Sequence, residues 1–274
     1  MNEEMTFLSL VGTSSYRVLN CDLRDSLMDR VRSGNPLVRL GVWLVSRLCL
    51  AISKRIFVAD HRRLQLLPPN VQGKTVILEN VADDLDPALA LTQVNGAIKI
   101  FVSGTLDRRR GLEAVLRAVE GQDDLELWVA GRLCDEYAAT VFIKSPKVRY
   151  FGLLPPDEAL RLASQTDAIF AYYAPDCRNH IYASPSKVFD AMSLGRPILL
   201  NSETKVSEWA VSHQLGYRAP YNDSDALRGI IQHLRELRPE LPQRANVIRR
   251  LYDEEYSPQV MIGRLLDAYK GLCG

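Results

Sequence analysis

The feature that most constrains this fold is an alternation of short apolar segments with helical patterns. Several apolar segments are rich in β-branched residues and almost continuous, as expected for strands covered on both faces. This alternation predicts an α/β fold with a doubly wound parallel sheet. The predicted strands are Tyr16–Asn20, Arg55–Ala59, Thr75–Glu79, Ile98–Ser103, Leu125–Ala130, Val148–Phe151, Ala168–Tyr172 and Pro197–Leu200. The predicted helices are Leu37–Ser53, Leu112–Glu120, Asp135–Ile143, Asp157–Ser164, Ser186–Ser193, Lys205–Ser212 and a tail from Ser224 to Leu272 with breaks near Pro239–Pro242 and Ser257–Pro258.

A polar stretch over residues 80–97 divides the chain into two unequal parts. The part after it carries five predicted strands, enough for a complete α/β domain, whereas the part before it carries about three. We therefore predict a shortened N-terminal α/β domain over residues 1–92. A complete Rossmann-like domain follows over residues 93–256.

Charge and cysteine usage exclude several classes of function. The formal net charge is +1, so no overall basic character favours nucleic acid. The five cysteines lie far apart without a CxxC pair, which is typical of reduced thiols rather than a disulfide framework or a zinc site. The first residues also lack the apolar run of a signal peptide. These features predict a cytoplasmic protein.

The longest apolar stretch, Pro36–Ala59, is unsuited to crossing a membrane. Four arginines and lysines interrupt it, and charged side chains are costly in a spanning helix. Two interpretations remain: a core helix of a globular domain, or an amphipathic helix on a membrane surface. We favour the core helix, and keep peripheral contact with the inner face of the cell membrane as the alternative.

A glycine-flanked basic loop follows the predicted strand that ends at Ser103. Gly104 opens the turn, and Arg108–Arg110 precede Gly111 and a helix. Ligands of open α/β sheets lie outside the carboxyl ends of the strands, and backbone N–H groups with guanidinium groups suit a diphosphate. The same residues would also make an ordinary solvated loop, so this loop alone does not decide between the two.

A second pattern, residues 182–200, places a lysine at the start of a helix. Ser184 is predicted to cap this helix, with Pro185 at its first position. Lys187 then lies in the first turn, where the helix dipole is positive, so a bound anion would explain a cation there. Asp190 lies on the same face and suits ribose hydroxyls. The alternative is a well-capped helix with a surface ion pair.

Other residues give weaker signals. Gly131 and Gly152 each end a predicted strand and would let a flat ligand approach the backbone, although ordinary turns use glycine in the same way. His180 lies in a loop before the serine-proline turn and could approach a sugar. The sequence lacks G-x-S-x-G, Walker and G-x-G-x-x-G motifs, which argues against hydrolase, P-loop and dinucleotide-binding functions.

With these motifs in place, the chain resembles retaining glycosyltransferases of family 4, which have the GT-B fold. The resemblance covers residues 98–272. It rests on SGTLDRRRGLEAVL, LELWVAG, VRYFGLLP and SPSKVFDAMSLGRPILL, which occur in the family's order and spacing. The final helix, residues 257–274, is similar to the family's crossing helix and is expected to pack back toward the N-terminal domain.

The resemblance implies a role for each matching residue. Arg110 and Lys187 would act on the diphosphate of a nucleotide-sugar donor and are the implied catalytic residues, with no metal or other cofactor. Asp190 would bind the ribose, and Gly152 with Leu153 would lie at the nucleobase. The remaining residues implied in donor binding are Gly104, Thr105, Arg109, Gly131, His180, Ser184, Pro185 and Ser186.

This sequence departs from the family pattern at three points. Tyr182 stands where the family has the first glutamate of its E-x7-E motif, and Thr105 replaces the arginine of a Gly-Arg pair. The N-terminal part resembles only the end of the family's first domain. The implied function is transfer of a sugar, with retention, to a carbohydrate or lipid-linked acceptor. The alternatives are a donor-binding subunit that needs a second polypeptide, a non-catalytic binding module, and a nucleotide-sugar epimerase.

Overall fold

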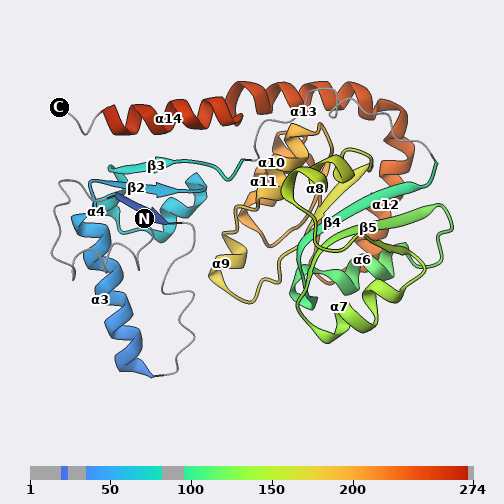
Figure 1. Ribbon diagram of the computed structural model, residues 1–274, viewed down its shortest axis with the longest axis horizontal. Helices are drawn as coiled ribbons and strands as arrows, with labels where there is room; N and C mark the ends of the chain where they lie inside the picture. The colour runs from blue at the N-terminus through green and yellow to red at the C-terminus, as the bar shows by residue number, and fades with distance from the viewer. Residues whose placement is uncertain (1–19, 24–34, 82–95, 271–274) are drawn as a thin grey trace.

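A computed structural model of the chain describes residues 20–23, 35–81 and 96–270. The described residues form two parallel β-sheets, one near each end of the molecule, and a long helical arm runs across the top of the view past both of them (Figure 1). The predicted α/β class is confirmed. Residues 82–95 lie outside the described part, so the predicted boundary at residue 92 stays a prediction.

The N-terminal sheet is small and has the order β1-β2-β3, with both strand pairs parallel. Parallel neighbours need crossover connections, and a helix follows β1 in sequence while a short turn region follows β2. A compact cluster of apolar side chains, including Leu50, Ile56 and Val58, covers the sheet. The elements are β1 (Asn20–Leu23), α3 (Pro36–Ile52), β2 (Arg55–Val58), η1 (His61–Leu66), α4 (Pro69–Gln72) and β3 (Thr75–Ile77).

Helix α3 begins with a clear capping signal but is poorly buried. The Asn35 side chain accepts a hydrogen bond from the Leu37 amide at 2.9 Å, and Pro36 occupies the first turn. Only Ser46, Cys49 and Leu50 are buried, all in its second half. The expectation of a core helix is therefore wrong for the first half of α3, which extends away from the sheet (Figure 1).

The C-terminal sheet is larger, with the parallel order β6-β5-β4-β7-β8-β9. The chain builds outward from β4 in one direction, then returns to the other side of β4 and builds outward again. The order therefore reverses between β4 and β7, which is where doubly wound sheets place their ligands. The strands are β4 (Ile98–Leu106), β5 (Leu125–Leu133), β6 (Val148–Tyr150), β7 (Ala168–Ala171), β8 (Ile198–Asn201) and β9 (Gly216–Ala219).

Helices cover both faces of this sheet with separate apolar clusters. One cluster packs α6, α7 and α12 against the sheet, and the other packs α8, α10, α11 and α13 against the opposite face. Strands covered on both faces need continuous apolar runs, as the sequence showed. The remaining elements are η2 (Arg108–Arg110), α6 (Leu112–Val119), α7 (Glu136–Thr140), η3 (Phe142–Lys144), α8 (Pro156–Ala163), α9 (Arg178–Ile181), α10 (Ser186–Ser193), α11 (Lys205–Ser212), α12 (Ser224–Leu237), η4 (Arg238–Glu240), α13 (Leu241–Glu255) and α14 (Pro258–Lys270).

The last helix, α14, reaches from the larger unit to the N-terminal sheet (Figure 1). An Arg264 guanidinium nitrogen lies 2.7 Å from a carboxylate oxygen of Glu79. The rings of Phe57 and Tyr269 stack with their centroids 6.1 Å apart. An ion pair and an aromatic contact therefore join α14 to the N-terminal part of the chain.

The sequence missed some elements and misplaced others. Strand β9 and helix α9 were not predicted, and the helix predicted over Asp135–Ile143 is two short helices that break at Val141. The predicted strand Tyr16–Asn20 lies almost wholly outside the described residues, and β1 begins at its last residue. None of the helices in the described part combines the length and apolarity that crossing a bilayer requires.

Candidate functional site

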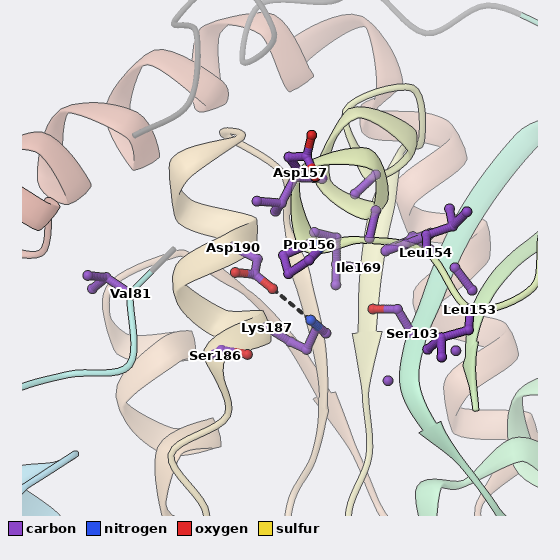
Figure 2. A pocket seen from close by; sticks show the side chains of 17 residues that line it. Val81, Ser103, Leu153, Leu154, Pro156, Asp157, Ile169, Ser186, Lys187 and Asp190 are labelled. Atoms are coloured by element: carbon purple, nitrogen blue, oxygen red, sulfur yellow. Dashed lines mark hydrogen bonds and ion pairs between the residues drawn. The ribbon is translucent and has the colours of Figure 1, made fainter. Parts of the chain in front are cut away.

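A cavity of about 440 Å³ lies where the strand order reverses. Its floor comes from the ends of β4 and β5, and its walls come from α8 and the first turns of α10 (Figure 2). This volume falls within the range of small-ligand pockets. The lining residues are Val81, Phe101, Ser103, Gly104, Ala130, Gly131, Leu153, Leu154, Pro156, Asp157, Ala159, Leu160, Ala163, Ile169, Ser186, Lys187 and Asp190.

A second cavity of about 230 Å³ adjoins the first. Both are lined by Ser103, Gly104, Ser186 and Lys187. The second cavity adds Thr105, Arg110 and Tyr173, so it is the more polar of the two in its side chains. The pair provides an apolar chamber and a cationic chamber that share one wall.

Lys187 lies at that shared wall and pairs with Asp190. Its Nζ lies 2.8 Å from Asp190 Oδ2, and Figure 2 shows the ammonium group between the helix and the cavity. Lys187 is the second residue of α10, whose first amides have no partner within the helix. Asp190 is only 6% exposed, and burial raises the pKa of its carboxyl group while Lys187 opposes that rise. The first turn of α10 thus concentrates positive potential beside the cavity.

Arg110 is brought to the same place by a left-handed turn. Gly111 has φ +70°, and a Cβ there would lie 2.8 Å from Tyr172 Cβ, so the turn requires glycine. The Arg110 guanidinium lies over the Tyr173 ring, 4.2 Å from its centroid. Burial raises the pKa of Tyr173, and the nearby Arg110 and Lys187 oppose that rise. The structure therefore brings two predicted residues, Arg110 and Lys187, to one cavity.

Arg109 and His180, which the resemblance placed in donor binding, point elsewhere. Arg109 makes two hydrogen bonds to Asp176, at 2.8 and 2.7 Å, and this contact lowers the pKa of the Asp176 carboxyl group. His180 Nδ1 lies 2.8 Å from the Ala174 carbonyl oxygen. Neither side chain lines the two cavities described above. They hold the segment before α10, which includes α9, instead.

The same loop contains the one group of side chains in the described residues with metal-ligand types close together. Ligand atoms of Asp176, Cys177 and His180 lie within 4.8 Å of one another. The Asp176 carboxylate, however, already accepts both hydrogen bonds from Arg109. A bound cation would compete with a guanidinium group, so we assign no metal to this cluster.

The glycines at the strand ends have different structural causes. A Cβ on Gly131 would lie 2.0 Å from the Gly104 carbonyl oxygen, so the close approach of β4 and β5 requires that glycine. Gly104 and Gly152 have φ +104° and +79°, and nothing lies within 4 Å of a Cβ at either. Leu153 is 68% exposed and lies at the cavity margin (Figure 2).

The predicted serine cap of α10 is wrong. Pro185 occupies the N-cap position and Ser186 begins the helix. The Ser184 hydroxyl group donates instead to the Ala59 carbonyl oxygen at 2.9 Å, in the N-terminal part of the chain. A tertiary hydrogen bond thus replaces the local one, and of the three residues in this turn only Ser186 lines both cavities.

The sequence did not indicate many of the residues that line the cavities, including Ser103, Tyr173, Asp157 and Val81. Ser103 lines both, and its hydroxyl group has no hydrogen-bond partner among the described residues. Tyr173 lies beneath Arg110, Asp157 comes from the start of α8, and Val81 follows β3 of the N-terminal sheet. The available signal was that Ser103 ends the predicted strand before the glycine-flanked loop, and that Tyr173 comes two residues after β7. Val81 comes from the other part of the chain and had none.

Comparison with known proteins gives no family model and no curated sequence that matches this chain. Solved structures do match. Sucrose-phosphate synthase from Thermosynechococcus elongatus is 13% identical, with a TM-score of 0.75 over 99% of this chain and 72% of that chain. Anabaena Alr3699/HepE in complex with UDP is 12% identical, with a TM-score of 0.73 over 98% and 77%. A glycosyltransferase from Rickettsia africae ESF-5 is 13% identical, with a TM-score of 0.64 over 99% and 80%.

These likenesses extend over both sheets of the chain. The predicted GT-B-like α/β architecture is therefore confirmed. At such low identity the comparison concerns the fold, because one fold supports many functions.

Proposed function

We propose that this chain is a glycosyltransferase that moves a sugar from a nucleoside-diphosphate-sugar to an acceptor hydroxyl group. The observation that carries the proposal is the placement of Lys187, Arg110 and the first turn of α10 around the paired cavities at the sheet's reversal point. The structural neighbour HepE, solved with UDP and with UDP-glucose, supports it by its shared fold. The proposal includes membership in glycosyltransferase family 4 and retention of the donor sugar's anomeric configuration.

The apolar and cationic chambers suit the two halves of such a donor. In this interpretation the base and ribose occupy the chamber with Leu153 and Asp190, and the diphosphate occupies the chamber with Arg110 and Thr105. Lys187 lies between them, as Figure 2 shows for its contact with Asp190. On binding, a phosphate oxygen would replace Asp190 Oδ2 as a partner of the Lys187 ammonium group.

The chemistry then depends on stabilising the diphosphate as it departs. The bond between the anomeric carbon and the phosphate oxygen breaks, and negative charge accumulates on the diphosphate. Fixed cations and helix amides already directed at that position stabilise this charge without reorganising. The acceptor hydroxyl forms the new bond and loses its proton. We expect turnover without a divalent ion, because side chains supply the positive charge.

The test is product analysis with UDP-, GDP-, ADP- and CDP-linked sugars, with and without candidate carbohydrate acceptors. We expect nucleoside diphosphate release and a glycosidic product that keeps the donor's anomeric configuration. An epimerised sugar formed without acceptor would identify the epimerase instead. Binding without any turnover would favour the non-catalytic module, and turnover only after a second polypeptide is added would favour the partner-dependent subunit.

We also propose that the protein works at the inner face of the cell membrane on a lipid-linked acceptor. The support is α3, which carries large apolar side chains in contact with water. Between Asn35 and Ala59 the sequence has four cations and no carboxylate, which complements anionic lipid. The exposed apolar side chains are Leu37, Val38, Leu40, Trp43, Leu44 and Leu48.

Vesicle co-sedimentation tests the membrane proposal. The protein should bind phosphatidylglycerol vesicles and lose that binding in a Leu40→Glu/Leu44→Glu variant. Val247→Glu is the matched control, because Val247 is an exposed apolar residue on α13. Equal binding by both variants would reject α3 as the contact, and equal binding to phosphatidylcholine would reject the role of charge.

A further inference from the structure

The turn after β2 contacts the segment that leads into α10, and this junction joins the two parts of the chain. Arg63, in η1, is only 9% exposed. Its Nε donates to the Tyr182 carbonyl oxygen at 3.1 Å, and Nη2 donates to Asn179 Oδ1 at 3.1 Å. One arginine of the N-terminal part thus holds the C-terminal end of α9.

A second hydrogen bond crosses the same junction in the opposite direction. The Ser184 hydroxyl group donates to the Ala59 carbonyl oxygen at 2.9 Å, and both residues are buried. Arg63 in the N-terminal part therefore donates two hydrogen bonds across the junction, and Ser184 in the C-terminal part donates one back. We call these three hydrogen bonds the clasp.

The clasp acts on the segment that presents the candidate site. Ser184 is followed at once by Pro185, Ser186 and Lys187, and the last two line both cavities. The far end of the same segment is held by Asp176, through its two hydrogen bonds to Arg109. The segment is thus fixed at one end by its own domain and at the other by the N-terminal part.

We propose that the clasp sets the position of the first turn of α10 in the donor cavity, with Arg63 as a positioning residue. The expected effect on donor binding rests on the function proposed above. The hydrogen bonds of the clasp do not depend on that function. Arg63 lines neither cavity described above, so its effect on a ligand would pass through the segment it holds. The N-terminal part would in this way control how well a donor binds to the C-terminal part.

The chain contains a matched control for this idea. Arg264 also makes a hydrogen bond across the two parts, to Glu79 Oε2 at 2.7 Å. That contact lies on α14 and touches neither α9 nor the start of α10. If the clasp only joined the two parts, Arg63→Ala and Arg264→Ala would behave alike. If it positions the segment, only Arg63→Ala should affect the segment and the ligand.

Hydrogen exchange of the full chain tests the positioning without any ligand. Losing hydrogen bonds to a charged donor should speed amide exchange over residues 179–187 about tenfold in Arg63→Ala. Ser184→Ala removes one hydroxyl group and should show a smaller change in the same segment, which guards against a folding defect of the arginine variant. Arg264→Ala should leave this segment unchanged. Equal exchange in wild type and both clasp variants would overturn the proposal.

Nucleotide affinity then tests the consequence, with UDP, GDP, ADP and CDP as probes. We expect Arg63→Ala to lower the affinity for the nucleotide that wild type binds by about tenfold. Arg264→Ala should leave that affinity unchanged. Arg63→Lys should not restore affinity fully, because an ammonium group does not reproduce the fixed fork of a guanidinium group. Equal losses in the Arg63 and Arg264 variants would overturn positioning. If wild type binds none of the four, the proposed function fails, and the exchange result still decides on the clasp.

Discussion

Helices α10 and α11 are a natural comparison within this molecule. Each is eight residues long, and α10 precedes strand β8 while α11 follows it. Each carries a lysine in its first turn and a carboxylate three residues later: Lys187 with Asp190, and Lys205 with Glu208. By sequence pattern alone the two are equivalent candidates for an anion site.

Their surroundings differ completely. Lys187 and Asp190 line the cavity at the sheet's reversal point, and Asp190 is buried. Lys205 and Glu208 are both exposed and line neither cavity. A lysine at a helix start is therefore a weak signal by itself, and the position of the helix in the sheet topology gives it meaning.

The largest expected effect is on catalysis. Lys187→Ala should lower sugar transfer about 100- to 1000-fold, the range for losing one preorganised group at a developing charge. Lys205→Ala should stay within about twofold, since an exposed charge far from the cavity contributes little. Steady-state kinetics with one donor measure both. Similar losses in the two variants would break the comparison.

The ends of the two helices should differ in stability. Gly195 follows α10 with φ +62°, and a Cβ there would lie 2.7 Å from Ala245 Cβ on α13. Gly195→Ala should therefore cost about 2–3 kcal/mol in the free energy of unfolding, through backbone strain and overpacking together. Denaturant unfolding measures it, and a loss below about 0.5 kcal/mol would mean that α13 yields to the added methyl group.

The carboxylates should respond differently to pH. Burial raises the pKa of Asp190 above its ordinary 3.8, so the folded protein holds that proton more tightly than the unfolded chain does. The protonated Asp190 carboxyl group therefore contributes its full stabilisation below the ordinary pKa. That stabilisation is lost as the pH rises through the raised pKa of the folded state. Asp190→Asn should therefore raise the melting temperature at pH 7 by about 2 °C.

That gain should shrink as the pH is lowered to 4, because the wild-type carboxyl group takes up its proton as the pH falls. Glu208→Gln is the control, and its melting temperature should follow wild type at both pH values. Scanning calorimetry of the three proteins checks this. A destabilised Asp190→Asn at pH 7 would show that the Lys187 contact outweighs the burial.

The smallest effect is expected at the end of α11. Gln214 follows α11 and has φ 57°, a backbone angle that residues other than glycine seldom adopt. Gln214→Gly should relieve this strain and raise the free energy of unfolding by about 0.5 kcal/mol. A decrease, measured by denaturant unfolding, would indicate that the Gln214 side chain makes a stabilising contact.

The comparison also shows how far the sequence could predict this molecule. Strands β4, β5, β7 and β8 were predicted because their apolar runs are nearly continuous. Strand β9 was missed because GYRA is short and contains Arg218, which an edge strand tolerates. Its glycine is needed for packing, since a Cβ on Gly216 would lie 1.9 Å from the Ile198 carbonyl oxygen.

The candidate site was predictable where topology decides it and not where distant partners do. Arg110 and Lys187 were both expected near one ligand, and both line the smaller cavity. Arg109 has the same chemistry as its neighbour but is taken by Asp176, 67 residues away. Ser184 has the chemistry of a helix cap but bonds Ala59, 125 residues away. No local pattern announces such partners.

The most direct test of the account is whether the cavity beside Lys187 binds a nucleoside diphosphate. Thermal shift of wild type, Lys187→Ala and Lys205→Ala against UDP-, GDP-, ADP- and CDP-linked sugars, with and without EDTA, measures this by mass action. We predict that one nucleotide family raises the melting temperature of wild type and Lys205→Ala, with or without EDTA, but not of Lys187→Ala. No shift with any donor, or an equal shift in all three proteins, would contradict it.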